Sequence, residues 1–134
     1  MYGLFADKWL TKLKNDVSGF QTKEDLQMKK LFLSSFFTDV SRLFAELMND
    51  EHKGKRVTFI PTAANPEKIR FFVEADRKAL QSIDLIVDET DIANCSREEI
   101  SAKLNENDYI FICGGNTFYL LQELKRKKID SLIV

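Results

Sequence analysis

The sequence predicts a three-layer α/β domain, because short apolar runs alternate with longer segments of helical periodicity from Met28 onward. The runs are compact and mostly apolar, as expected for parallel strands that are covered on both faces of a sheet. They lie at residues 30–34, 57–60, 84–87 and 109–113. A chain of 134 residues is long enough for one domain of this kind.

The first two connections between these runs predict helices of ordinary length. In the first, apolar residues recur at helical spacing up to Met48, and Thr38 or Asp39 is placed to act as the N-cap. In the second, Pro66 fits the first turn of a helix, and a buried face begins at Ile69. Each helix would return the chain to the start of the next parallel strand.

The last two helices carry clearer signals at their ends. Ser96 and Glu99 have the spacing of a capping box, which predicts a short helix from about residue 96 to residue 104. A further helix is expected to begin near Thr117 and to end in the basic cluster at residues 125–128. We interpret that cluster as a solvated helix end rather than a phosphate site, because the net charge of the chain is -1.

Residues 1–27 differ from the rest, because apolar side chains recur every three or four positions without an obvious strand. These residues are Phe5, Trp9, Leu13, Val17 and Phe20. The pattern predicts an amphipathic helix or leader in addition to the domain formed by residues 28–134. Its apolar stripe could dock on that domain or pair with another chain.

The composition excludes several classes of protein. Hydrophobic residues make up 44% of the chain and charged residues 31%, which is typical of a globular protein. The near-zero net charge gives no general attraction to nucleic acid or to an anionic membrane. The charged N-terminus lacks the long apolar stretch of a signal peptide or membrane span, and Cys95 and Cys113 are too few for a disulfide framework. We therefore expect a cytoplasmic protein with reduced thiols.

The most informative candidate site follows the run at residues 109–113. Gly114 and Gly115 allow a tight turn whose N–H groups stay open to an oxyanion or a phosphate. Asn116 can add an amide donor or cap the next helix, and Thr117 can also cap it. The alternative is a plain strand-to-helix turn. The spacing fits neither a phosphate loop nor a dinucleotide fingerprint, so no nucleotide cofactor is expected.

Other residues with chemical potential have weaker patterns. Cys113 ends an apolar run and is interpreted as a buried thiol. His52 is surrounded by charged residues at a predicted helix end, where an imidazole that is solvated or faces the helix dipole is expected. Asp88, Glu89 and Asp91 could bind a metal, but surface loops often carry such acids and no histidine completes a ligand set. We predict no metal site.

Three segments in this order resemble the dipeptidase E and cyanophycinase family of serine peptidases. They read MKKLFLSS at residues 28–35, FIPTAA at residues 59–64 and YIFICGGNTFYLL at residues 109–121. The strongest similarity is at residues 114–118, and the resemblance extends over residues 28–134. It implies a flavodoxin-like sheet similar to that of class I glutamine amidotransferases, which in this chain would be incomplete at the C-terminus.

The resemblance also implies an activity, the hydrolysis of small acidic peptides with an N-terminal aspartate or, in relatives, of β-aspartyl bonds. Gly114, Gly115, Asn116 and Thr117 would form the oxyanion and substrate-binding turn. The serine of such enzymes lies in a G-x-S-x-G elbow and is activated by a later histidine and acid. The 134 residues contain no such elbow, and Ser131 lacks the flanking glycines. We expect no catalytic residue in this chain and no turnover by it alone.

Two other readings stay open at this stage. The chain could be a non-catalytic module that holds a small anion or an acidic peptide without cleaving it, with Ser34, Ser35, Thr62, Asn116 and Thr117 lining the crevice. It could also be an assembly subunit. The run at residues 109–113 would then lie near an uncovered sheet edge, which favours a homo-oligomer or a partner that supplies further strands.

Overall fold

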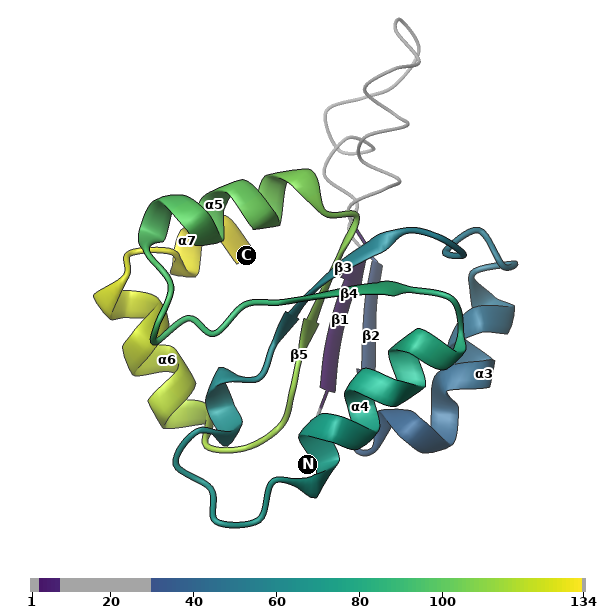
Figure 1. The fold of residues 1–134 in the computed structure, drawn as a ribbon, viewed down its shortest axis with the longest axis horizontal. Helices are drawn as coiled ribbons and strands as arrows, with labels where there is room; N and C mark the ends of the chain where they lie inside the picture. Colours follow the sequence, from purple (N-terminus) through teal and green to yellow (C-terminus); the bar gives the residue numbers. More distant parts are fainter. Residues whose placement is uncertain (1–2, 8–29, 134) are drawn as a thin grey trace, which may run out of the picture.

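A five-stranded sheet forms the centre of the computed structural model, which describes residues 3–7 and 30–133 (Figure 1). Strands β3, β4 and β5 are parallel, with β3 in the middle of the three. The order across the sheet is β2 (Lys30–Ser34), β1 (Gly3–Asp7), β5 (Tyr109–Ile112), β3 (Arg56–Ile60) and β4 (Ile86–Glu89). The predicted three-layer α/β fold is confirmed.

One layer of helices packs on the sheet through aromatic side chains. It consists of α3 (Phe37–Leu47) and α4 (Phe71–Ser82), drawn to the right of the sheet in Figure 1. Phe59 and Phe111 come from adjacent strands and stack with ring centroids 5.6 Å apart. Phe37 of α3 meets Phe111 edge-on at 5.1 Å. Aromatic pairs of this geometry stabilise a core beyond the area they bury.

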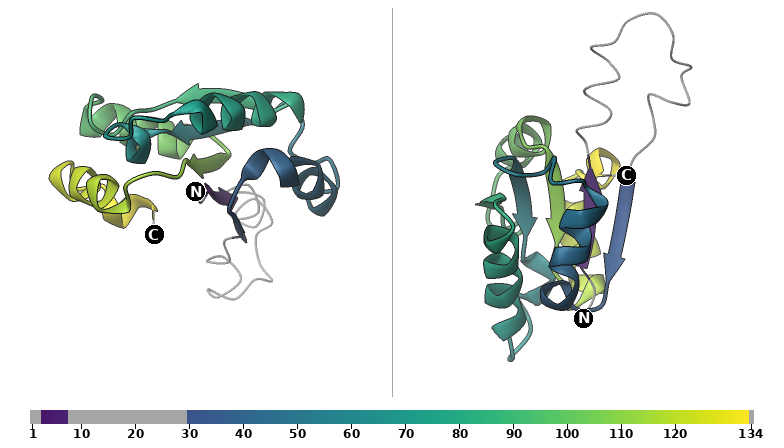
Figure 2. Two further views of the ribbon diagram at one scale, coloured as in Figure 1. Left: turned by 90° about the horizontal axis from the view of Figure 1, so that it is seen from below. Right: turned by 90° about the vertical axis from the view of Figure 1, so that its right-hand side faces the viewer.

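The opposite layer is aliphatic. It consists of α5 (Arg97–Glu106), α6 (Thr117–Arg126) and the short α7 (Asp130–Ile133), on the other side of the sheet in both views of Figure 2. The side chains of β5 alternate between the two layers, so Tyr109 and Phe111 face α3 and α4 while Ile110 and Ile112 face this layer. Its buried core includes Ile60, Ile92, Ile100, Leu104, Leu120 and Ile129.

The prediction of one amphipathic helix over residues 1–27 is wrong at Gly3–Asp7, which form a strand. This strand, β1, pairs antiparallel with both β2 and β5. Its backbone groups thereby satisfy those of two strands that would otherwise present unpaired edges, and this gain overrides the helical spacing. The remainder of the predicted helix, residues 8–27, lies outside the described residues.

The expectation that residues 109–113 lie near an uncovered edge is also wrong. In the described structure β5 is an inner strand, because β3 pairs with it on one side and β1 on the other. The two edges belong to β2 and β4, which carry Lys30 at one end of the sheet and Asp88 and Glu89 at the other. Charged residues are common on edge strands, where they oppose uncontrolled pairing.

Two helices start at positions other than the predicted ones. The N-cap of α3 is Phe36, without a side-chain cap, rather than Thr38 or Asp39. Helix α4 begins at Phe71 and not near Pro66, and Ile69 is 70% exposed. Before Pro66 the chain forms a separate 3-10 turn, η1 (Thr62–Ala64), and the amide of the following Asn65 donates to Asp91. By contrast, the Ser96 and Glu99 capping box of α5 is confirmed.

Strand β4 begins two residues later than the predicted run at residues 84–87. Asp84 adopts a positive φ of 67°, and its carbonyl accepts a hydrogen bond from the Gly54 N–H at 2.7 Å. These two features make Asp84 part of the turn that leaves α4. Among residues 3–7 and 30–133, no helix combines the length and apolar character needed to cross a bilayer.

Candidate active site at the carboxyl end of the sheet

The Gly114–Gly115 turn lies where β5 ends and α6 begins, as the sequence predicts. Gly114 is buried, Gly115 is half-buried, and Asn116 and Thr117 are exposed. Asn116 is the N-cap of α6, and its side-chain oxygen accepts a hydrogen bond from the Tyr119 N–H at 3.0 Å. The turn therefore sits at the carboxyl edge of the sheet, at the positive end of the α6 dipole.

Gly115 cannot be replaced without moving its surroundings. Its φ is +144°, and a Cβ there would collide with the backbone of Ala63 and lie 2.7 Å from the Ala64 nitrogen. The Asn116 N–H donates to the Ala63 carbonyl at 2.7 Å. The turn is thus pressed against η1, the loop that leaves β3, and only glycine permits this approach.

The backbone N–H groups of the two glycines have no acceptor among the described residues. The neighbouring amides differ, because the Cys113 N–H donates to Ile60 and the Asn116 N–H donates to Ala63. Two N–H groups without acceptors, next to a helix N-terminus, can stabilise negative charge on a carbonyl oxygen or an anion. Backbone N–H groups of this kind are the donors that an oxyanion site would use.

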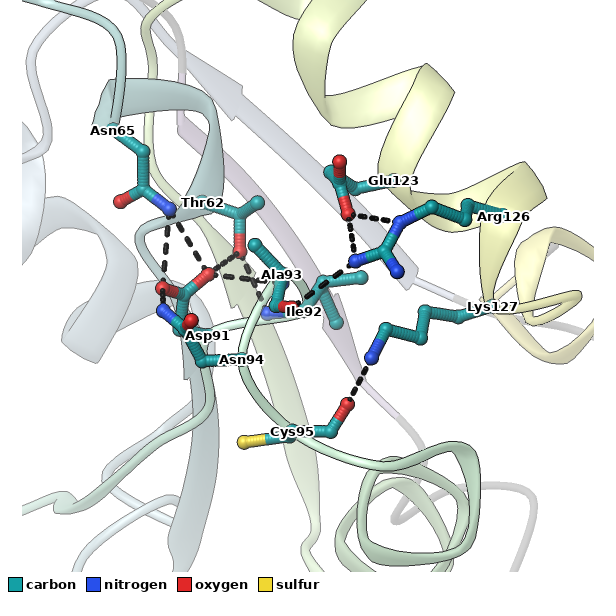
Figure 3. A network of polar contacts seen from close by, with 10 residues as sticks. All are labelled: Thr62, Asn65, Asp91, Ile92, Ala93, Asn94, Cys95, Glu123, Arg126 and Lys127. Atoms are coloured by element: carbon teal, nitrogen blue, oxygen red, sulfur yellow. Dashed lines mark hydrogen bonds and ion pairs between the residues drawn. The ribbon is translucent and has the colours of Figure 1, made fainter.

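Asp91 fixes the loop against which the glycine turn is pressed (Figure 3). One of its carboxylate oxygens accepts the Thr62 hydroxyl at 2.9 Å, and the Asn65 amide donates to both oxygens at 3.1 Å. The Ala93 N–H and the Asn94 amide donate to the same carboxylate. The Thr62 hydroxyl in turn accepts the Ile92 N–H at 2.8 Å. The loops after β3 and β4 therefore form one hydrogen-bonded unit.

The charge state of Asp91 follows from these contacts. Partial burial acts to raise the pKa of its carboxyl, but the hydrogen bonds from Asn65, Thr62, Ala93 and Asn94 outweigh this and hold it below its ordinary value. Asp91 is therefore ionised at neutral pH. An ionised acceptor makes its hydrogen bonds stronger than neutral pairs would be.

The match to a family model covers residues 31–134 and carries the description peptidase family S51. The chain belongs to peptidase family S51. The resemblance to the dipeptidase E family seen in the sequence is confirmed, and the fold places the matched segments in one α/β unit.

Bacterial proteins described as uncharacterized peptidases have high similarity to this chain. An uncharacterized peptidase of Listeria monocytogenes is 55% identical over 107 residues, which is 80% of this chain and 52% of that protein. An uncharacterized peptidase of Pasteurella multocida is 44% identical over 79% of this chain and 51% of its own length. A crystal structure of a protein from Listeria monocytogenes EGD-e, named as a peptidase E, is 54% identical and superposes with a TM-score of 0.72. The match covers 75% of this chain and 49% of that protein. This chain thus spans about half the length of the relatives it matches.

A buried pair that the sequence did not reveal lies beneath the S51 glycine turn. Asp76 of α4 is 5% exposed, and its carboxyl is hydrogen-bonded to the thiol of Cys113, the residue that precedes Gly114. Burial raises the pKa of Asp76 to about 6, although the thiol acts to lower it. Burial and the neighbouring carboxylate raise the pKa of Cys113 as well. The prediction of a buried thiol at Cys113 is confirmed.

The basic cluster at residues 125–128 is more than a solvated helix end. The Arg126 guanidinium binds Glu123 and donates to the Ala93 carbonyl at 3.1 Å, and the Lys127 ammonium donates to the Cys95 carbonyl at 2.7 Å (Figure 3). These contacts attach the end of α6 to the loop that Asp91 organises. A cation near a helix C-terminus is a usual sequence signal, but its target carbonyl is set by the tertiary fold.

The remaining candidates lie apart from this site or are already engaged. His52 is fully buried and its Nε2 is hydrogen-bonded to the Ile83 carbonyl at 2.8 Å, so the solvated imidazole, one of the two expected environments, is wrong. It precedes β3 and lies at the opposite end of that strand from the glycine turn. Ser131 lies in α7, outside the turn. Positive φ angles at Asn49 and Asp50 curl the chain so that His52 packs edge-on against Phe44.

The three acidic residues after β4 have separate partners. Asp88 binds Lys103 and Asn107, Glu89 binds Arg77, and Asp91 holds the loops as described above. In the part of the chain that the structure describes, no group of three histidine, cysteine or carboxylate side chains could hold a metal ion. Each carboxylate acts as a local structural acceptor.

Only some of the residues that a non-catalytic binding module would use have polar groups left for a ligand. The Thr62 hydroxyl and the Asn116 side-chain oxygen are used within the protein. Ser35 and Thr117 are exposed. The Ser34 hydroxyl is buried and has no partner within the described residues. Ser34 pairs with Gly3 of β1, and the next residue, Leu4, pairs with Ile112, the last residue of β5. Ser34 therefore lies at the same end of the sheet as the glycine turn.

Proposed function

We propose that this chain carries the oxyanion and substrate-binding side of a serine peptidase that acts on small acidic peptides with an N-terminal aspartate. Gly114 and Gly115 would hold the oxyanion, and Asn116 and Thr117 would line the substrate site. The observation that carries the proposal is the pair of glycine N–H groups without described acceptors at the end of a central strand. Membership of the S51 family supports the peptidase chemistry.

The rigid setting of the turn supports this role. An oxyanion site is effective when its donors are already in place, because no reorganisation is then needed during the reaction. The contact of Gly115 with Ala63, and the five hydrogen bonds that Asp91 accepts, supply such a setting. The donors would therefore be organised before a substrate arrives.

The chain alone is not expected to hydrolyse peptides. Its sequence contains no G-x-S-x-G elbow, and its one histidine is buried at the other end of β3. A turn that stabilises an oxyanion cannot form one without a nucleophile. Purified chain should give no release of free aspartate from aspartyl dipeptides, measured by an amino-acid assay. Turnover that survives the Gly115→Ala substitution would contradict the proposal.

The alternative function is a non-catalytic module that binds a small anion or an acidic peptide at the same turn. The two glycine N–H groups without described acceptors would suit an anion as well as an oxyanion. Calorimetry separates the two readings. Binding of aspartyl dipeptides in preference to inorganic phosphate, lost in Gly115→Ala, supports the peptidase site. Binding of inorganic phosphate at least as tightly as the dipeptides supports the anion module.

A further inference from the structure

A buried carboxyl lies beneath the glycine turn, and the site described above gives it no role. Asp76 of α4 is 5% exposed, and its carboxyl is hydrogen-bonded to the thiol of Cys113. Cys113 is itself 2% exposed, and the next residue in the chain is Gly114. The carboxyl therefore contacts the residue whose peptide bond carries the first of the two N–H groups without acceptors.

The carboxyl of Asp76 has few hydrogen-bond donors for a buried acid. Its Oδ1 atom is buried and has no partner within the described residues. The carboxylate of Asp91, at the same end of the sheet, accepts five hydrogen bonds. Burial without such donors favours the neutral acid, because an isolated charge is costly away from water. Burial accordingly raises the pKa of Asp76 to about 6, while the thiol acts to lower it.

The cation next to Asp76 in the sequence is committed to other partners. The Arg77 guanidinium binds the carboxylates of Glu74 and Glu89. It also lies over the ring of Phe59, 5.4 Å from the ring centroid. One positive charge is thus shared between two carboxylates. It leaves no surplus positive charge to balance an ionised Asp76.

The other elements packed against α4 bring mainly apolar side chains to the underside of the turn. The buried side chains of α3 are Phe37, Ser41 and Phe44. Those of β3 on this face are Val57 and Phe59. The ionisable residues Tyr109 and His52 belong to the same side of the sheet, but they lie at the amino ends of β5 and β3. Asp76 and Cys113 are thus the ionisable groups placed directly under the glycines.

An ionised Asp76 opposes negative charge at the turn. The two glycine N–H groups and the N-terminus of α6 attract an anion. A carboxylate about 10 Å from that anion, at an effective dielectric constant of about 20, weakens its binding by about tenfold. The neutral acid causes no such repulsion. The protonation state of one buried side chain therefore sets how well the turn holds negative charge.

We propose that Asp76 determines the affinity of the glycine turn for a negatively charged ligand, which binds more tightly with the Asp76 carboxyl neutral than with it ionised. Binding is then stronger in mild acid than at neutral pH. This inference rests on the proposed function only in taking the turn as a site for negative charge. It holds equally for the peptidase site and for the anion-binding module.

The N–H resonances of the two glycines test the link without any ligand. Of the five glycines in the chain, only Gly114 follows a cysteine and only Gly115 follows a glycine. Nitrogen-15 labelling of glycine, with carbon-13 labelling of cysteine or glycine carbonyls, therefore assigns both resonances. We expect both to shift with pH around a midpoint of about 6 in the parent, and to lose that transition in Asp76→Asn. The Gly54 N–H, which donates to the Asp84 carbonyl, is the internal reference.

Sulfate is the probe for binding, because its charge is constant over this range of pH. Its affinity is measured at the same resonances, at constant ionic strength. The parent should bind sulfate about tenfold more weakly at about pH 7.5 than at about pH 5. The affinity of Asp76→Asn should change by less than about twofold. Because binding and protonation are linked, saturating sulfate should also raise the glycine midpoint of the parent by about one pH unit.

Glu74→Gln is the matched control, because it removes a carboxylate from the exposed side of the same helix. It should keep the pH profile of the parent. An equal change of profile in Glu74→Gln and Asp76→Asn would overturn the proposal, since any carboxylate of α4 would then serve.

Other outcomes decide the remaining points. Glycine resonances that show no transition in the parent would overturn the proposal, whether or not the variants fold. A pH dependence that persists in Asp76→Asn would assign the effect to another group, such as His52. Failure of sulfate to bind at either pH would overturn it too. A sulfate profile that depends on Asp76, in a chain that binds no aspartyl dipeptide, would support this inference and contradict only the proposed peptide substrate.

Discussion

The loops that follow β3, β4 and β5 lie at the same end of the sheet, but they differ in how far their polar groups are hydrogen-bonded within the protein. In the first pair, Asp91 accepts hydrogen bonds from both loops, and the Thr62 hydroxyl both donates and accepts. In the second, the N–H groups of Gly114 and Gly115 have no acceptor among the described residues. The loops around Asp91 have their polar groups hydrogen-bonded, and they hold in place a glycine turn whose N–H groups are left for a ligand.

The contact between the two regions should be broken most strongly by Gly115→Ala. The new Cβ would collide with Ala63 in a backbone conformation that L residues rarely adopt. We expect a loss of about 4 kcal/mol in the free energy of unfolding, from strain and overpacking together. Urea unfolding measures this loss.

Gly54→Ala is the matched control for that substitution. Gly54 also has a positive φ, of +76°, but a Cβ there would meet nothing within 4 Å. Its cost should be near 1 kcal/mol, since only the backbone preference is lost. Equal losses for the two variants would show that the close approach to Ala63 does not matter.

The support itself is tested by Asp91→Ala. The substitution removes the acceptor for donors on Thr62, Asn65, Ala93 and Asn94. We expect a loss of about 3 kcal/mol, because several donors lose a charged partner in a half-buried site. Asp91→Asn retains one acceptor oxygen and should lose less. If both variants unfold at the parent's urea midpoint, Asp91 does not organise the loops.

The sequence predicted the turn but not its support, and the reason is physical. Gly114, Gly115 and Asn116 are adjacent, so their glycine pair and cap can be recognised locally. Asp91 and Thr62 are far apart along the chain, and their pairing depends on how the parallel strands align. For the same reason, the spacing of Ser96 and Glu99 predicted α5 correctly, while the burial of His52 depends on Phe44 in α3 and on Ile83 just after α4.

The strand at Gly3–Asp7 shows the limit of periodicity in a short segment. Phe5 fits both a helical stripe and an extended strand, because five residues cover little more than one helical turn. The choice is made by the edges of β2 and β5, which offer hydrogen-bond partners to an extended chain. No local signal in the sequence reports those partners.

The buried carboxyl of Asp76 makes the underside of the turn sensitive to pH. Its pKa is raised in the folded state to about 6 from an ordinary value of 3.8, so the folded protein binds the proton more tightly than the unfolded chain does. Stability should therefore fall as pH rises from about 4 to above 6, by about 2 to 3 kcal/mol at most.

Asp76→Asn isolates this contribution from that of other carboxyls. The variant cannot ionise at this position, so the parent should be similar to it near pH 4 and less stable than it near pH 7. Melting temperatures of the two proteins across this range give the measurement. A constant difference between them would mean that Asp76 does not titrate in the window that its burial implies.

The smallest effect is expected at the start of α5. The Ser96 hydroxyl accepts the Glu99 N–H at 3.2 Å, and the Glu99 carboxylate accepts the Ser96 N–H at 2.8 Å. Ser96→Ala removes one half of this exchange and should cost about 1 kcal/mol. Because the cap is exposed and lies beyond the Asp91 loops, ligand binding at the glycine turn should not change. Urea unfolding measures the loss of stability, and calorimetry with an aspartyl dipeptide measures binding. A loss of binding in Ser96→Ala would mean that α5 also holds the glycine turn in place.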